Sequence, residues 1–171
     1  MIRRKTVHVL LISLVLCYSY FFFGKTPQRP NILFFGGREY PIQQVPMLAY
    51  WDYGKNSAGT GKIAPPKFDV NRTDNMVGYI AKWEISGSKL FLAEIEGAID
   101  GKTAKSEEIL PKFEFPQHAD WYTGKIFLGV GDYESSSKKF TAVICFQVAK
   151  GNVTKMVFFD ELAIPISWNG E

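Results

Sequence analysis

The sequence predicts a mainly β protein, an antiparallel sandwich or small barrel, preceded by one N-terminal transmembrane helix. Three observations carry this prediction: runs of alternating polarity between glycine turns, a near absence of helical patterns, and a long uncharged apolar run at the N-terminus. The 171 residues suffice for one domain but hardly for two. We therefore expect a membrane anchor over residues 1–24, a linker over 25–31 and a single β-rich domain over 32–171.

The N-terminal run is typical of a single membrane span. Residues 6–24 contain no Asp, Glu, Lys or Arg, and their apolar part, residues 7–23, would form a helix about 25 Å long. The basic residues at positions 3–5 outnumber those that follow the run. By the positive-inside rule, the N-terminus lies in the cytoplasm and the domain lies outside, in a periplasmic or extracellular space. We expect residues 7–23 to contact the lipid bilayer.

Two other fates of this segment stay open. A cleaved signal peptide needs small residues just before the cut, but the exits near Ser19 and Gly24 place tyrosine or phenylalanine there. A lipoprotein would be acylated on Cys17, but Leu16 occupies the position where a small residue is expected. An uncleaved signal-anchor fits these residues best.

The distribution of charge argues against a nucleic-acid partner. The net charge is +3, from 20 basic and 17 acidic residues, but five of the basic residues lie in the first thirty positions. The remaining chain has 15 basic and 17 acidic residues, a net charge of −2. Since phosphate contacts supply most of the affinity for nucleic acids, we expect the domain to bind none.

The clearest strand pattern lies in residues 77–85. Tyr79, Ala81 and Trp83 fall on one face, and polar residues alternate with them. A Ser-Gly-Ser turn follows, and residues 90–95 return as the second strand of a hairpin.

Further strands are predicted along the rest of the chain. A second hairpin joins residues 140–149 to 153–159 through Lys-Gly-Asn. Single strands are expected at residues 32–35, 40–43 and 125–130. This run of short strands favours an antiparallel architecture, because an α/β fold needs crossover helices that the sequence lacks.

The sequence predicts one short helix and one long loop. Residues 106–110 form a helical turn that Ser106 caps and Pro111 ends. Residues 54–75 are rich in Gly, Pro, Asn, Ser and Thr and are predicted to be irregular.

No motif assigns a catalytic, cofactor-binding or metal-binding residue. The Gly-Thr-Gly-Lys run at 59–62 lacks the first glycine and the final Ser or Thr of a phosphate loop. His118 and Asp120 are spaced to face the same side of a strand, but no nucleophile is marked for them to activate. Cys145 lies in an apolar run and is expected to be a buried thiol.

Carboxylates offer the one enzymatic alternative. Glu94 and Glu96 share a strand face, as do Asp132 and Glu134. A small envelope hydrolase would use Glu94, Glu96 and Asp120, with at least two carboxylates about 5–10 Å apart. Acidic residues two apart are also common on a solvated strand face.

Tryptophans and sequons add two weaker signals. Asn71 and Asn152 each begin an Asn-x-Thr sequon, which matters only in a host that glycosylates. The four tryptophans are expected to be core residues, while two exposed in a row would indicate sugar stacking. They are Trp51, Trp83, Trp121 and Trp168.

The chain resembles a group of small uncharacterised bacterial proteins. The shared signature reads Gly-Tyr-x-Ala-x-Trp-x-Ile at 78–85, Leu-x-Leu-x-x-Ile at 90–95 and Ala-Asp-Trp-Tyr-Thr-Gly at 119–124. It spans roughly residues 38–160. The Gly-Tyr stretch that follows in that group is only partly matched at 129–133. The group has no established activity, so the resemblance implies one compact domain and no site residues.

Together these patterns predict a membrane-anchored extracytoplasmic domain of the cell envelope. A non-enzymatic binding or structural module with a protein or glycan partner accounts for them best. The alternatives are the carboxylate hydrolase and an immunity-type protein that binds a toxin, the latter suggested by small size alone.

Overall fold

The computed structural model describes residues 29–52, 63–70, 74–137 and 139–162, with side chains up to residue 160. The expected anchor, most of the linker, the glycine run at 59–62, Asn71 and Trp168 lie outside these ranges. Within them, no helix is long and apolar enough to cross a membrane.

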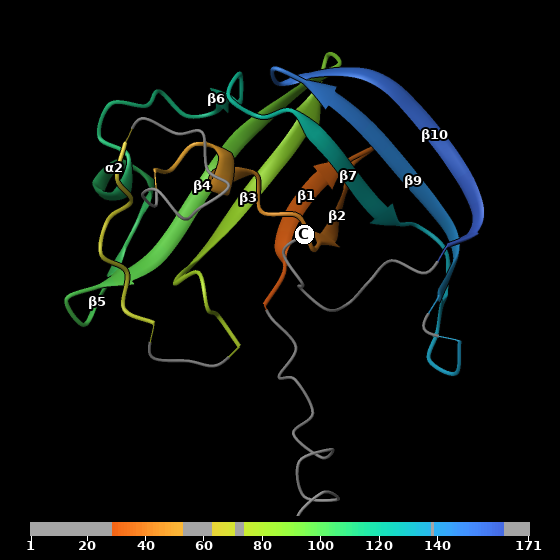
Figure 1. Ribbon diagram of the computed structural model, residues 1–171, viewed down its shortest axis with the longest axis horizontal. Helices are drawn as coiled ribbons and strands as arrows, with labels where there is room; N and C mark the ends of the chain where they lie inside the picture. Colours follow the sequence, from red (N-terminus) through yellow and green to blue (C-terminus); the bar gives the residue numbers. More distant parts are fainter. Residues whose placement is uncertain (1–28, 53–62, 71–73, 138, 163–171) are drawn as a thin grey trace, which may run out of the picture.

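The described chain is mainly β, as the sequence predicts (Figure 1). Its strands are β1 (Asn31–Phe35), β2 (Arg38–Ile42), β3 (Tyr79–Ser86), β4 (Lys89–Ile99), β5 (Lys102–Ala104), β6 (Gln117–His118), β7 (Gly124–Gly129), β8 (Tyr133–Glu134), β9 (Lys139–Ala149) and β10 (Asn152–Leu162). Two short helical segments join them: the 3₁₀ turn η1 (Pro46–Ala49) and the helix α2 (Ser106–Ile109).

The strands form a single mixed sheet that is not closed. The main path runs β2-β1-β3-β4-β10-β9-β7, with β5 and β6 paired to β4 and β8 paired to β9. The expected sandwich or barrel was purely antiparallel, whereas β1 and β3 run parallel. The long connection between β2 and β3 lets β3 begin at the same end of the sheet as β1, so the two strands run parallel.

The sheet turns a corner between β4 and β10. These two strands share one register pair, Asn152 with Lys89, and then diverge. In Figure 1, β3 and β4 descend on one side and β9 and β10 on the other, with β1, β2 and β7 between them. The sheet therefore folds into two leaves that enclose the core.

Side chains bridge the gap where the sheet fails to close. The ends of the path, β2 and β7, lie against each other without backbone pairing. The Phe127 N–H donates to the side-chain oxygen of Gln44 (3.2 Å), and the Asn31 amide donates to the Gln44 carbonyl (2.9 Å). The Asn31 oxygen accepts from the Ala81 N–H (2.8 Å). These bonds form a seam that joins β1, β3 and β7 through two side chains.

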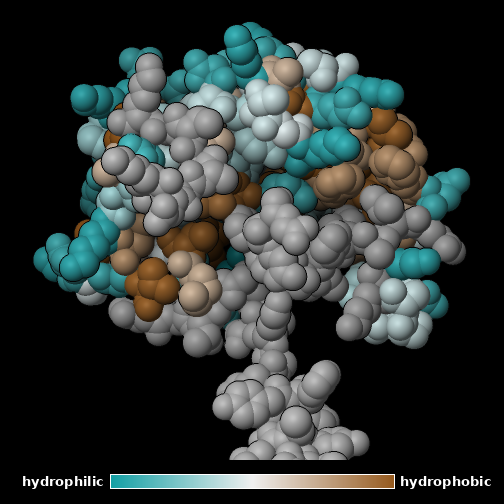
Figure 2. All heavy atoms as spheres, in the orientation of Figure 1, coloured by the Kyte–Doolittle hydropathy of each residue, from teal (hydrophilic) through white to brown (hydrophobic). Residues whose placement is uncertain are grey.

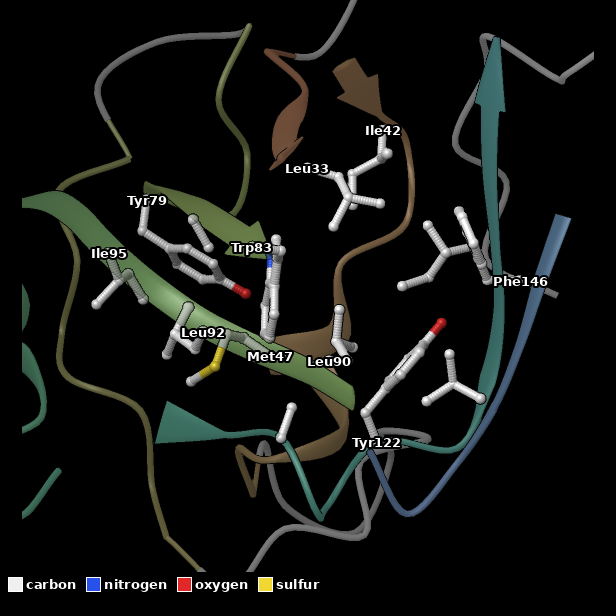
Figure 3. Packing of buried hydrophobic residues seen from close by; sticks show 14 of the residues in the cluster. Leu33, Ile42, Met47, Tyr79, Trp83, Leu90, Leu92, Ile95, Tyr122 and Phe146 are labelled. Atoms are coloured by element: carbon white, nitrogen blue, oxygen red, sulfur yellow. The ribbon is translucent and has the colours of Figure 1, made fainter. Parts of the chain in front are cut away.

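The β3–β4 hairpin confirms the clearest sequence prediction. Tyr79, Ala81 and Trp83 are all at most 1% exposed and lie on the concave face. Gly87 and Ser88 form the turn with φ of 54° and 61°, the pair of left-handed residues that suits the twist of a tight hairpin. Figure 3 shows Tyr79 and Trp83 side by side in the core, with Leu92 beneath them.

The second predicted hairpin, β9–β10, is also present. Lys150 and Gly151 form its turn with φ of 48° and 73°. The turn packs against the segment after β6, where the Gly151 N–H donates to the Tyr122 carbonyl (2.9 Å) and the Lys150 N–H donates to Thr123 (3.0 Å). This contact fixes the corner of the sheet.

The short helix lies where the sequence predicts it, but its first residue has another role. Lys105 occupies the N-cap position, and its N–H donates to the Glu108 carboxylate (3.4 Å). Ser106 is 6% exposed, and its hydroxyl accepts from the Ile95 N–H (3.0 Å). Because Ser106 fills a gap in the β4 edge, it ties the helix to the sheet instead of capping it.

Candidate functional site

The three carboxylates of the hydrolase alternative do not form one site, because Asp120 lies apart from Glu94 and Glu96. Glu94 and Glu96 do share a face of β4, opposite Lys82 and Ile80, but this is the outer face of the sheet. Glu94 is ion-paired with Lys82 (Nζ to Oε2, 2.9 Å), and this bond raises the pKa of Lys82. Both side chains stay largely solvated, so the pair is a surface salt bridge.

Asp120 lies at the other end of β4. The Ala119 N–H donates to the Leu90 carbonyl (2.9 Å), which places Asp120 near that residue. Glu94 follows Leu90 by four positions, about 13 Å along a strand. Asp120 and Glu94 therefore lie at different levels along β4, and this placement gives no support to a three-carboxylate site.

The spacing of His118 and Asp120 allows a pair, and the described contacts of His118 include none with Asp120. Its ring packs on Phe91, with centroids 5.7 Å apart, and its Nε2 is buried without a hydrogen-bond partner in the described chain. Asp120 is exposed. Among the described residues, no carboxylate therefore holds the Nε2 atom of the imidazole, as base catalysis would require.

The other candidate residues have structural surroundings. Glu134 accepts a hydrogen bond from Ser137 (2.6 Å) in an exposed turn, and Asp132 precedes the same turn. Cys145 is 3% exposed, and burial raises the pKa of its thiol. The described residues hold no group of three or more metal-ligating side chains. Asn152 is exposed at the β9–β10 turn, where its amide donates to the Lys150 carbonyl (3.0 Å).

The described tryptophans belong to the packed interior or its rim. Trp51 and Trp83 are each 1% exposed, which confirms them as core. Trp121 is half-buried in an aromatic cluster, with ring centroids 4.9 Å from Tyr50 and 5.5 Å from Phe113. Because these rings contact one another edge-on or tilted, they present no row of exposed faces for sugar stacking.

Polar ring atoms inside this packing lack partners. The indole N–H groups of Trp51, Trp83 and Trp121 are buried with no hydrogen-bond acceptor in the described chain. Burial, with a smaller contribution from Asp120, raises the pKa of Tyr50. A buried N–H group without an acceptor costs free energy of folding. Within the described residues, these three indole groups define no ligand site.

The feature that the sequence did not indicate is the exposed edge of β10. Three large apolar side chains on this strand are exposed: Met156 at 46%, Phe158 at 65% and Phe159 at 37%. In Figure 2, apolar surface gathers on the side where β9 and β10 lie in Figure 1. The run Met-Val-Phe-Phe is typical of a core strand, so the sequence carried no signal of this exposure.

No protein-family model matches the chain, and neither a curated protein nor a solved structure matches it.

Proposed function

We propose that the chain is a membrane-anchored, non-enzymatic module of the cell envelope that binds a protein partner through β10. The exposed apolar residues of this strand carry the proposal. Soluble proteins rarely leave a long apolar edge strand open to water, because it pairs readily with another chain. An immunity-type role would be one case of such binding, and the hydrolase alternative has no comparable support.

The proposal keeps the topology inferred from the N-terminal residues. Residues 7–23 span the cytoplasmic membrane, and the domain lies on its outer side. The resemblance to small bacterial proteins implies no activity for the chain. Within this proposal, the two leaves joined at the Gln44 seam act as a small, incompletely closed barrel.

The topology is tested by extracting membranes with alkaline carbonate and by adding protease to cells with a permeabilised outer layer. We expect the full chain to stay in the membrane pellet and its domain to be cleaved only from outside. Recovery of the intact chain from the cytosol would overturn the topology.

The binding role is tested by cross-linking the full chain in intact cells. The variant Phe158→Lys should lose its cross-linked complex, whereas Phe34→Lys should keep it. Phe34 is a matched control because it is 44% exposed on β1, away from β10. Complexes that persist equally in both variants would contradict a binding role for β10.

A further inference from the structure

The backbone groups of β10 that face away from β9 follow from the hydrogen-bond pattern of the neighbouring strands. The Phe127 N–H points away from β9 to Gln44, and Phe127 is paired with Cys145. In an antiparallel ladder the paired groups alternate, so Cys145 directs its N–H and C=O toward β10, where Val157 faces it. Val157 is therefore bonded to β9.

The neighbours of Val157 direct their backbone groups outward. By the same alternation, the backbone N–H and C=O groups on the side away from β9 belong to Met156, Phe158, Asp160 and Leu162. The strand start agrees, since the Val153 N–H points outward to the Ser88 carbonyl (2.9 Å) before the bulge. Beyond Val153, no backbone hydrogen bond within the described ranges reaches this edge.

We propose that a second copy of the chain pairs with this edge, β10 against β10, antiparallel about a two-fold axis at Phe158. The inference rests on the proposed function and names its partner. A two-fold antiparallel pair of identical strands requires one residue to face itself. Phe158 is the most exposed large apolar side chain of β10, so we centre the axis there.

This register pairs three of the four outward residues and places opposite charges across from each other. Phe158 bonds to Phe158 of the second copy, and Met156 bonds to Asp160 twice, giving about six backbone hydrogen bonds in the pattern of a regular ladder. The strand has a basic residue, Lys155, near its start and Asp160 near its end. Antiparallel pairing about Phe158 therefore places Lys155 of each copy opposite Glu161 of the other, next to Asp160, whereas parallel pairing would align like charges.

The register also buries the most exposed ring of the strand. Phe158, at 65% exposed, lies opposite its own copy at a Cα separation of about 5.5 Å, close enough for the rings to pack. Met156 lies on the same face and would be covered in part. Pairing with a second copy would therefore bury apolar surface of β10 that is exposed to water in the monomer.

Cysteine cross-linking of the full chain tests this register. In a Cys17→Ser background, Phe158→Cys places two thiols across the two-fold axis, within the Cα range of a disulfide. The matched control Lys155→Cys lies three positions away, so its two copies are about 20 Å apart. Mild oxidation should convert most of the Phe158→Cys chain to a dimer on a non-reducing gel and leave the control monomeric.

A second variant separates self-pairing from binding in general. Phe158→Pro removes an N–H that the fold of the monomer does not use, so its circular dichroism should match wild type. Light scattering should show its dimer dissociation constant raised at least tenfold. A monomeric wild-type chain, or equal cross-linking at both cysteine positions, overturns the self-pairing. If a complex with a different protein in cells still depends on Phe158, the proposed function stands without self-pairing. If no complex depends on Phe158, both proposals fail.

Discussion

Replacing Asn31 by alanine should destabilise the domain more than any other single change at the seam. Asn31 is 5% exposed, and its side chain accepts from the Ala81 N–H and donates to the Gln44 carbonyl. Alanine leaves the buried Ala81 N–H without an acceptor, which costs about 1–3 kcal/mol. With the second bond and the lost packing, we expect a total loss of about 2–4 kcal/mol.

Equilibrium urea denaturation, followed by tryptophan fluorescence, measures this loss. With a slope of about 2 kcal/mol per molar urea, the midpoint should fall by about 1–2 M. The comparison variant Gln44→Met removes only the acceptor of the Phe127 N–H at a half-buried position, so it should cost about 1 kcal/mol. If Asn31→Ala is no more damaging than Gln44→Met, the seam does not hold the sheet as described.

Three further predictions follow from buried groups. Gly151→Ala should destabilise the domain by at least about 2 kcal/mol in the same urea assay. The φ of Gly151 is +73°, and an added Cβ would lie 2.6 Å from His118 Nε2 and 2.7 Å from the Ala119 oxygen. An unchanged urea midpoint would contradict this packing. Burial raises the pKa of Tyr122 to about 12, so the stability it confers is complete below about pH 10 and about 2–3 kcal/mol is lost as pH rises to about 12. Tyr122→Phe should flatten this alkaline slope, and an equally steep slope in the variant would refute the assignment. The Cys145 thiol, 3% exposed and with its pKa raised by burial, should react with a thiol reagent at pH 8 only after unfolding; rapid labelling of the native domain would show that it is accessible.

Local patterns in the sequence predicted the hairpins well. The faces of β3 follow from its alternation, and Tyr79, Ala81 and Trp83 are buried as expected. The turn at Lys150 and Gly151 was also readable, because few residue pairs accept two positive φ angles. Each of these features depends on residues close together in the chain.

Features that depend on distant residues could not be predicted. The parallel pairing of β1 with β3 places Leu33 beside Trp83, fifty positions later, and no periodicity encodes that distance. Ser106 resembled a helix cap, but its hydroxyl bonds Ile95 on a neighbouring strand. The exposure of Phe158 depends on the divergence of β4 from β10 after Asn152, so an apolar run alone could not reveal it.

The Gln44 seam has a consequence for how this fold tolerates change in length. Since β2 and β7 share no ladder, neither strand dictates which residue of the other stands across from it. An insertion or deletion in the β1–β2 turn at Gly36 and Gly37 would leave the alignment of β7 and β9 untouched. A change in the length of that turn therefore need not shift the register of the β7–β9 ladder, as long as the Gln44 side chain still reaches the Phe127 N–H.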